Sequence, residues 1–319
     1  MRVRADEMKR PIEKYKAIVV ILLLALLVVI IPNLITLFGW RVNYLKQVYA
    51  IIPIWIIAGL SLTIINGYVG EISLAQAALM GLGSYASAIL STRGVPIYLA
   101  VVVAIIISMF GAFLLSIPTM RVRGPYFVVA SMAFNGIFYQ VVVNWIDLTR
   151  GPNGISGIPS YGRLPFWGTY LPWLVAAICL IFVWYLSNTR IGKSMMAVRD
   201  DDLAASAIGL KVTFIKTFAF VISGMLAGLA GILLGHLIGY ISPDYYTIDQ
   251  SVFLLTMVLL GSVRKLEGVI LGALLMVAIQ EFLRGYPSIQ LLLYGLSMLI
   301  VIIFVPEGIY ATIERRLKK

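Results

Sequence analysis

Few residues in the sequence have types and spacing that could do chemistry. The chain of 319 residues has one histidine, His236, and one cysteine, Cys179, each within an apolar run. Since His236 has no Cys or acidic neighbours at ligand spacing, we expect a packed, hydrogen-bonded core histidine, and we expect a buried thiol at Cys179. The Gly192-Lys193-Ser194 run resembles the end of a phosphate-binding loop, but that loop needs Gly at position 187, where this chain has Ser. We therefore predict a chain without catalytic residues, metal site or cofactor of its own.

Small and polar residues interrupt the apolar runs over 66–78, and these types suit a solute path. A broken helix at membrane depth is tolerated only where it packs in protein or lines a water-filled cavity. A plain cytoplasmic turn that ends at Glu71 explains the same stretch equally well. Farther along, Asn135 and Tyr139 are four residues apart and share one helix face. The residues we expect along a pathway are Gly70, Ser73, Gln76, Asn135 and Tyr139.

The loop 190–213 carries the most informative pattern. Three Asp residues precede Leu-Ala-Ala-Ser-Ala-Ile and then Gly209, which predicts a short helix over 200–209 with an acidic start and a glycine stop. A thin, alanine-rich helix flanked by charges could enter a groove of another protein, although a solvated loop helix without a partner is the alternative. The candidate contact residues are Arg199, Asp200, Asp202, Ala204, Ala205, Gly209 and Lys211.

Two further stretches indicate contacts. In the loop 147–170, eight of 24 residues are Gly or Pro, so we expect irregular backbone that serves as a gate or docking lip, with Asn153 and Ser156 as candidate docking residues. The glycines at 224, 228, 231, 235 and 239 form a small-residue stripe on one helix, which predicts close helix packing, including packing against a second membrane subunit.

The elements that must position these residues are transmembrane helices. Hydrophobic residues make up 61% of the chain and charged residues 12%, with a mean hydropathy of +0.98, which excludes a soluble domain. Eight runs without charge are 21 residues or longer, and runs of 14 and 13 residues follow at 250–263 and 268–280. Because about 20 residues cross the hydrocarbon core, we predict an all-α bundle of ten spans, or eight if 250–283 is a re-entrant hairpin.

The charge distribution predicts the orientation. With ten spans and both termini inside, the inside segments hold 19 Lys and Arg and the outside segments six, as the positive-inside rule requires. The net charge of +11 is then a topological signal, and nucleic acid is excluded as a partner. We predict a cytoplasmic tail at 1–16, one membrane domain at 17–310 whose first run is a retained anchor, and a basic tail at 311–319.

Five motifs in order give the chain its resemblance to a known family. They are Gly67, Gly70, Ser73, Leu74, Gln76, Ala77 and Ala78; Arg123, Gly124, Tyr126 and Phe127; residues 151–159; Ala204, Ala205 and Gly209; and the segments 241–243, 257–262 and 306–308. Together they resemble the M-type permease subunit of branched-chain amino-acid ABC importers. Ala75 replaces a usual Gly, and Leu203 stands where the family has Glu, with Asp202 one position early.

The resemblance implies a division of labour in a cell inner membrane. A binding protein outside captures leucine, isoleucine or valine, and two homologous permeases, identical or different, form the pathway. Two cytoplasmic ATPases bind ATP and magnesium, and loop 190–213 transmits their closure. A permease for urea or amides, sugars or nucleosides shares this plan, and a secondary transporter is a more distant alternative.

Overall fold

The computed structural model describes residues 42–283, apart from 120, 121, 123, 165 and 166, and a few later positions (285, 286, 289, 292, 293, 295, 296, 299, 308–310 and 312). The chain divides into two units, residues 1–50 and 51–319, and the first is described only from residue 42. The predicted tail 1–16, the predicted span 17–40 and nearly all of the tail 311–319 lie outside the described residues.

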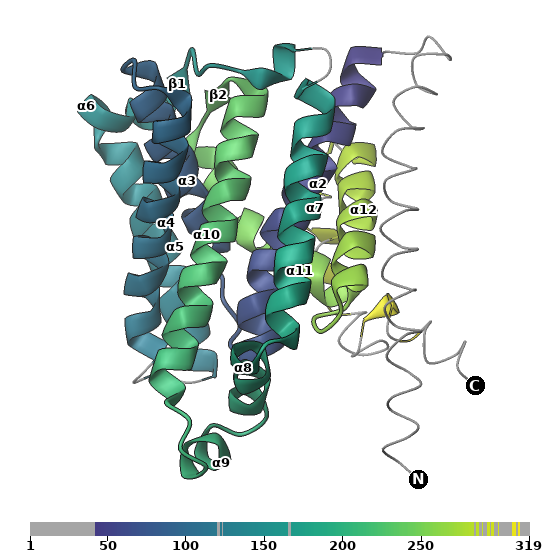
Figure 1. Cartoon of the computed structure of the whole chain (residues 1–319). Helices are drawn as coiled ribbons and strands as arrows, with labels where there is room; N and C mark the ends of the chain where they lie inside the picture. The colour runs from purple at the N-terminus through teal and green to yellow at the C-terminus, as the bar shows by residue number, and fades with distance from the viewer. Residues whose placement is uncertain are drawn as a thin grey trace. The chain divides into compact units, whose positions relative to one another are not determined.

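Helices make up most of the described chain (Figure 1). The long ones are α2 (Val42–Leu62), α3 (Gln76–Thr92), α4 (Ile97–Thr119), α5 (Pro125–Asn144), α7 (Trp167–Asn188), α10 (Val212–Ile238), α11 (Ile248–Gly261) and α12 (Leu266–Phe282). The connections contain η1 (Thr63–Val69), α6 (Ile146–Thr149), η2 (Gly151–Asn153), β1 (Ile155–Ser156), η3 (Tyr161–Arg163), α8 (Arg190–Asp200), α9 (Asp202–Ala207), β2 (Tyr240–Ile241) and η4 (Pro243–Tyr246).

Five helical segments within the described residues are long and apolar enough to cross a membrane. They are Tyr44–Val69, Ile97–Pro118, Pro125–Asn144, Trp167–Asn188 and Val212–Ile238. The helices α4, α5 and α7 leave large apolar side chains exposed, among them Phe110, Ile137 and Ile178. Lipid is the solvent that accepts such surface, so the chain is a multi-pass helical membrane protein.

The predicted span over 72–92 is helical only from Gln76. The chain leaves α2 through η1, a π-helix, and Gly70 ends that turn with a left-handed φ of +85°. Residues 70–75 have no regular structure, and we call them the unwound segment. Glu71, Ser73 and Ala75 of this segment are buried in protein, which is the environment that irregular backbone at membrane depth requires. The structure thus favours the broken helix over the plain turn ending at Glu71.

Helix α10 packs against α3 and α4 through its glycines. A Cβ added at Gly228 would lie 2.5 Å from Ser108 Cβ, and one added at Gly83 would lie 2.6 Å from Gly228 Cα. A Cβ at Gly231 would collide with the carbonyl oxygen of Met80. The predicted stripe of small residues is therefore a packing surface within this chain.

The two short runs form a helix pair, α11 and α12. Helices of 14 and 17 residues are about 21 and 26 Å long, shorter than a hydrocarbon core of about 30 Å. Their backbones approach closely, because a Cβ at Gly272 would meet Met257 O and one at Gly261 would meet Gly268 O. A close antiparallel pair is common to both predicted arrangements, two spans or a re-entrant hairpin.

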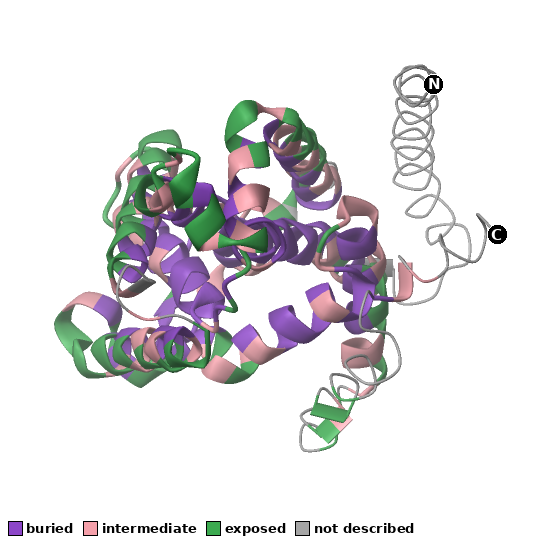
Figure 2. Ribbon diagram, turned by 90° about the horizontal axis from the view of Figure 1, so that it is seen from below, coloured by how far each residue is buried: buried purple, intermediate pink, exposed green. Residues whose placement is uncertain are grey.

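The loops gather at two opposite ends of the second unit (Figure 1). Helices α8 and α9 lie at one end, and α6, β1 and β2 lie at the other. The strands β1 and β2 form an antiparallel pair, with Ile155 opposite Ile241 and Ser156 opposite Tyr240. Figure 2 shows buried residues facing the interior of this unit and exposed residues on its periphery. The segments predicted for opposite sides of the membrane therefore lie at opposite ends.

Candidate functional site

A closed set of hydrogen bonds joins Gln76 to two other helices. Gln76 Nε2 donates to Ser223 Oγ of α10 at 3.1 Å, and Ser61 Oγ of α2 donates to Gln76 Oε1 at 3.2 Å. Ser223 Oγ in turn donates to the carbonyl oxygen of Ser61 at 2.8 Å. All three side chains are buried. We call these residues the Gln76 network, and it fixes the start of α3 between α2 and α10.

Side chains of α5 hold the unwound segment, and one from α11 holds the start of α3. Asn135 Nδ2 donates to the Leu74 carbonyl at 3.2 Å and to Ser251 Oγ at 3.0 Å. Ser131 Oγ accepts from the Leu74 amide at 2.9 Å, and Ser251 Oγ accepts from the Ala77 amide at 3.0 Å. Backbone groups that a helix would pair internally are thus paired with side chains. Asn135 Oδ1 is buried without a hydrogen-bond partner within the part of the chain that the structure describes.

The other predicted pathway residues lie around the same region. Ser73 is buried, and its hydroxyl accepts from the Ala75 amide at 3.2 Å. Tyr139 is half-buried on the same side of α5 as Asn135, and its hydroxyl lies 3.4 Å from Asp244 Oδ1 of η4. Gly70 lies at the far end of the unwound segment, against the side chain of Arg199. The structure therefore brings Ser73, Gln76 and Asn135 together and places Gly70 and Tyr139 on either side.

The short helix in loop 190–213 is α9, and its boundaries correct the prediction. It begins at Asp202 rather than at Asp200, because Asp201 is the N-cap: Asp201 Oδ1 accepts from the amides of Leu203 and Ala204 at 2.8 and 3.0 Å. Asp200 instead ends α8. Gly209 follows α9 with a φ of +85°, as the predicted glycine stop requires.

Arg199 links α8 to the end of η1. Its Nη1 donates to the Gly67 carbonyl at 2.7 Å, while its Nη2 lies 2.7 Å from Asp200 Oδ1. The hydrogen bond from the Arg199 guanidinium lowers the pKa of the exposed Asp200 carboxyl. A Cβ at Gly70 would lie 2.5 Å from Arg199 Cγ, so glycine is needed there both for its φ and for this contact.

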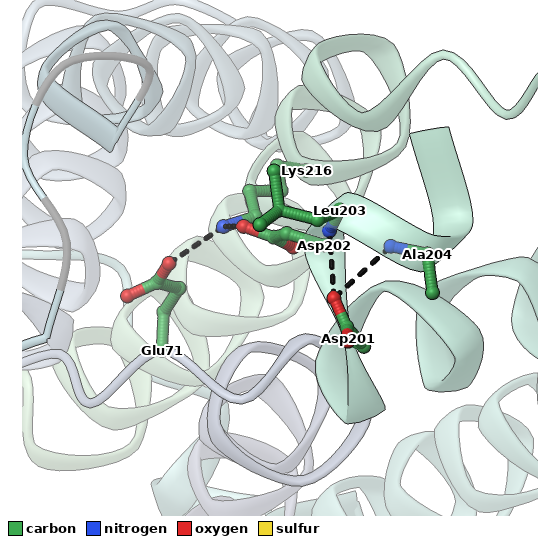
Figure 3. Close-up of polar contacts among 6 residues, drawn as sticks. All are labelled: Glu71, Asp201, Asp202, Leu203, Ala204 and Lys216. Atoms are coloured by element: carbon green, nitrogen blue, oxygen red, sulfur yellow. Dashed lines mark hydrogen bonds and ion pairs between the residues drawn. The ribbon is translucent and has the colours of Figure 1, made fainter. Parts of the chain in front are cut away.

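A buried lysine joins α9 to the unwound segment (Figure 3). Lys216 Nζ, from the first turns of α10, lies 2.8 Å from Glu71 Oε1 and 2.8 Å from Asp202 Oδ2. The side chains of Lys216 and Glu71 are only 7% and 8% exposed, and that of Asp202 is 16% exposed. We call Glu71, Asp202 and Lys216 the carboxylate–lysine triad.

Sequence reasoning named Asp202 but missed Glu71 and Lys216 as site residues. A signal for Lys216 was present, because it lies on the same helical face as Phe220 and Ser223, and a cation on an apolar face needs a buried partner. The identity of that partner depends on the path of the chain 145 residues earlier, which local patterns do not give.

The outward surface of α9 and of the residue after it carries large apolar side chains. Leu203 and Ile208 are 71% and 76% exposed, and Ala204 is exposed beside them. Ala205 faces the opposite way and is buried, whereas Gly209 and Lys211 are exposed. Among the candidate contact residues, Ala205 therefore packs inside the chain. The exposed surface over 203–208 includes Leu203, Ala204 and Ile208, together with Ser206 and Ala207.

The predicted docking residues lie at the opposite end of the unit. Asn153 and Ser156 are both exposed. The Asn153 carbonyl accepts from Tyr240 Oη at 3.1 Å, and Ser156 belongs to β1. Nearby, Ser160 Oγ donates to the Leu237 carbonyl at 3.0 Å, and Tyr161 Oη donates to the Leu233 carbonyl at 2.8 Å. This loop is thus fastened to the last turns of α10.

The lone histidine and cysteine are structural. His236 is buried, with Nδ1 2.8 Å from the Pro159 carbonyl oxygen and Nε2 beside Ser87 Oγ, so the predicted core histidine is confirmed. The predicted burial of Cys179 is also confirmed. Over the described residues, no group of three or more His, Cys, Asp or Glu side chains is arranged to hold a metal ion.

The apolar spans, the buried polar interior and the interrupted helix define the class as a polytopic membrane permease. The chain belongs to the family described as branched-chain amino acid transport system / permease component, whose sequence profile matches residues 44–305. The resemblance seen in the motifs is thereby confirmed.

Individual relatives place the chain within this family. It is 30% identical over 295 residues to the high-affinity branched-chain amino acid transport system permease protein LivM of Salmonella typhimurium, covering 83% of this chain and 69% of the relative. LivM of Escherichia coli matches to the same extent. The autoinducer 2 import system permease protein LsrC of Escherichia coli is 24% identical, over 93% of this chain and 89% of LsrC.

A solved structure shares the fold. PsaBC from Streptococcus pneumoniae in complex with Fab superposes with a TM-score of 0.50 at 17% identity, over 89% of this chain and 100% of that chain.

Proposed function

We propose that this chain is one of the two permease subunits of an ATP-driven importer that brings branched-chain amino acids across the inner membrane. The observation that carries the proposal is the 30% identity with LivM over 83% of the chain, together with the family match over residues 44–305. In this proposal a binding protein outside the membrane delivers leucine, isoleucine or valine. Two partner ATPases supply the energy with ATP and magnesium, and this chain hydrolyses nothing.

In this proposal α9 is the element that a partner ATPase contacts. Its support is the exposed apolar surface of Leu203, Ala204 and Ile208. An apolar surface at a loop end, bordered by the charges of Arg199, Asp200 and Lys211, suits a protein groove. Asn153 and Ser156, exposed at the other end of the unit, are proposed to meet the binding protein.

The proposed solute path passes the unwound segment. Its support is that broken helices in membranes occur where backbone lines a path or packs in protein. Asn135 Oδ1 retains a free acceptor there within the described part of the chain. An acceptor of this kind can receive a hydrogen bond from the ammonium group of a passing amino acid.

A second candidate solute is autoinducer 2, because LsrC of Escherichia coli matches 93% of this chain, although at only 24% identity. The two candidates share a mechanism and differ in what the permease admits. A competition experiment therefore separates them.

The test is uptake of radiolabelled leucine by proteoliposomes that contain this chain with its own partner permease, ATPases and binding protein. We expect uptake that requires internal ATP, persists after ion gradients are collapsed, and is reduced by unlabelled isoleucine and valine. Uptake driven by an ion gradient without ATP would contradict the ATP-driven mechanism. Reduction by autoinducer 2, with none by isoleucine or valine, would assign the second solute.

A further inference from the structure

We propose that Lys216 is a positioning residue that makes the unwound segment follow α9, so that a movement of α9 reaches the Gln76 network. The inference rests on the proposed function, because it takes α9 as the element that a partner ATPase moves. It assigns to Lys216 and Glu71 a part in coupling that neither the motifs nor the comparisons give them.

Lys216 joins two carboxylates that belong to different elements. The three members of the triad come from three elements: Glu71 from the unwound segment, Asp202 from the first position of α9, and Lys216 from α10. One ammonium group lies 2.8 Å from a carboxylate oxygen of each neighbour (Figure 3). The ammonium group of Lys216 thus connects α9 to the unwound segment.

The ion pair between Lys216 and Glu71 is buried. Lys216 and Glu71 are both less than a tenth exposed. When one partner of a buried ion pair is removed, the other is left as an uncompensated charge, which is strongly unfavourable. If α9 moved alone, Asp202 would withdraw one of the two carboxylates that face the buried ammonium group, and Lys216 would retain only Glu71. Because the triad resists separation, α9 and the unwound segment move together.

A second contact holds the other side of the same turn. Arg199, which lies just before α9, donates to the Gly67 carbonyl at 2.7 Å and packs against Gly70. Arg199 therefore contacts residues 67 and 70, and Asp202 reaches residue 71 through Lys216. The loop 190–213, which carries α9, is therefore connected to residues 67–71 at two places.

The unwound segment leads directly from the triad to the buried network. Glu71 precedes Gln76 by five residues, which span at most about 17 Å of extended chain. Leu74, between them, is held by Ser131 and Asn135 of α5. Irregular backbone without its own helical hydrogen bonds can shift as a unit, and such a shift changes how Gln76 meets Ser61 and Ser223.

The experiment compares variants of the whole reconstituted importer by the solute taken up per ATP hydrolysed. In Lys216→Met, we expect ATP hydrolysis to continue while this ratio falls about tenfold, within the range of coupling free energies between sites. Lys216→Arg should retain most of the ratio, because a guanidinium can reach both carboxylates. Arg93→Gln, which removes an exposed cation at the other end of the unit, is the matched control.

Two further readouts separate coupling from stability. Glu71→Gln combined with Lys216→Met should lower the ratio no more than Lys216→Met alone, because both changes cut the same connection. Hydrogen exchange should show that ATP changes protection over 70–78 in the wild-type importer. In Lys216→Met, ATP should change protection in α9 only.

The outcomes are distinct. A wild-type importer without ATP-driven uptake would contradict the proposed function itself. A functional wild type with an unchanged ratio in Lys216→Met would overturn the inference alone. A parallel fall of uptake and ATP hydrolysis would also overturn it, because it would show that Lys216 only stabilises the fold. If Lys216→Met fails to assemble, Asp202→Asn, on the more exposed side of the triad, is read by the same criteria.

Discussion

Gln76 and Ser223 are 147 residues apart in the sequence, yet the side-chain amide of Gln76 donates to the hydroxyl of Ser223 at 3.1 Å. With Ser61, which bonds to both, they form a closed set across α2, α3 and α10. The set lies where α3 begins, beside backbone that lacks helical hydrogen bonds. The start of α3 is therefore determined by long-range side-chain contacts rather than by a local capping residue.

Replacing Gln76 tests this set. In Gln76→Leu, the hydroxyls of Ser61 and Ser223 each lose a partner in a buried site, so we expect a loss of about 1–3 kcal/mol in the free energy of unfolding. Ser223→Ala should cost about 1 kcal/mol. The double variant should cost less than the sum, because the residues share one network. Unfolding in mixed micelles by SDS titration measures all three, and strictly additive losses would contradict the closed set.

Replacing glycine by alanine should change stability differently at Gly231 and at Gly136. In Gly231→Ala, the new Cβ meets the backbone carbonyl of Met80, so we expect a loss of about 1–3 kcal/mol from overpacking. In Gly136→Ala, the new Cβ has no atom within 4 Å, so stability should stay or rise by up to about 1 kcal/mol from helix propensity. Thermal unfolding of the two variants in one detergent compares them. Equal effects at both positions would show that the α10 packing is looser than described.

The neighbouring alanines of α9 should separate docking from folding. Ala204 is exposed and Ala205 is 3% exposed. In Ala204→Phe, we expect unchanged thermal stability, because the position is exposed. We expect reduced co-purification of the partner ATPase, because the bulkier side chain would not fit a groove that accepts alanine. In Ala205→Phe, we expect a loss of stability of about 1–3 kcal/mol from overpacking. Undiminished ATPase binding and ATP-driven uptake in Ala204→Phe would argue against α9 as the docking element.

Alkaline pH should reveal the environment of Tyr161. Burial raises the pKa of its phenol above the ordinary value of about 10. The folded state therefore favours the neutral phenol, and this contribution to stability is full below about pH 10 and declines as pH rises further. Tyr161→Phe loses the hydrogen bond to Leu233, about 1 kcal/mol at neutral pH. It should lose less additional stability above pH 10 than the wild type, as thermal unfolding across pH measures, and equal alkaline losses would contradict this assignment.

Local chemistry explains which parts of the structure could be predicted. The acidic start and glycine stop of α9 act within a few residues, so its existence was predictable, although the pattern predicted a start at Asp200 and the helix begins at Asp202, after its N-cap Asp201. The apolar runs likewise predicted α4, α5, α7 and α10. The glycine stripe predicted close packing on α10 but did not identify α3 and α4 as its neighbours.

The remaining features depend on contacts between distant segments. The carboxylate–lysine triad unites positions 71, 202 and 216 only after three elements meet. The unwound segment is part of an apolar run after Glu71 in the sequence. Its backbone at Leu74 pairs with Ser131 and Asn135 of α5 instead of forming helical hydrogen bonds. A pattern of residue types along the chain does not identify partners that are distant in sequence.

The uninterrupted course of α10 limits which changes of chain length the protein can accept. The helix has no proline from Val212 to Ile238, and it carries Lys216 near one end and leads into β2 at the other. Each residue of a helix advances the chain by about 1.5 Å and turns it by about 100°. A one-residue insertion or deletion between Lys216 and Tyr240 would therefore rotate Lys216 by about 100° relative to Tyr240. The triad and the pairing of Tyr240 with Ser156 would then not form together. Evolutionary gaps among relatives should fall in the loops and spare this interval.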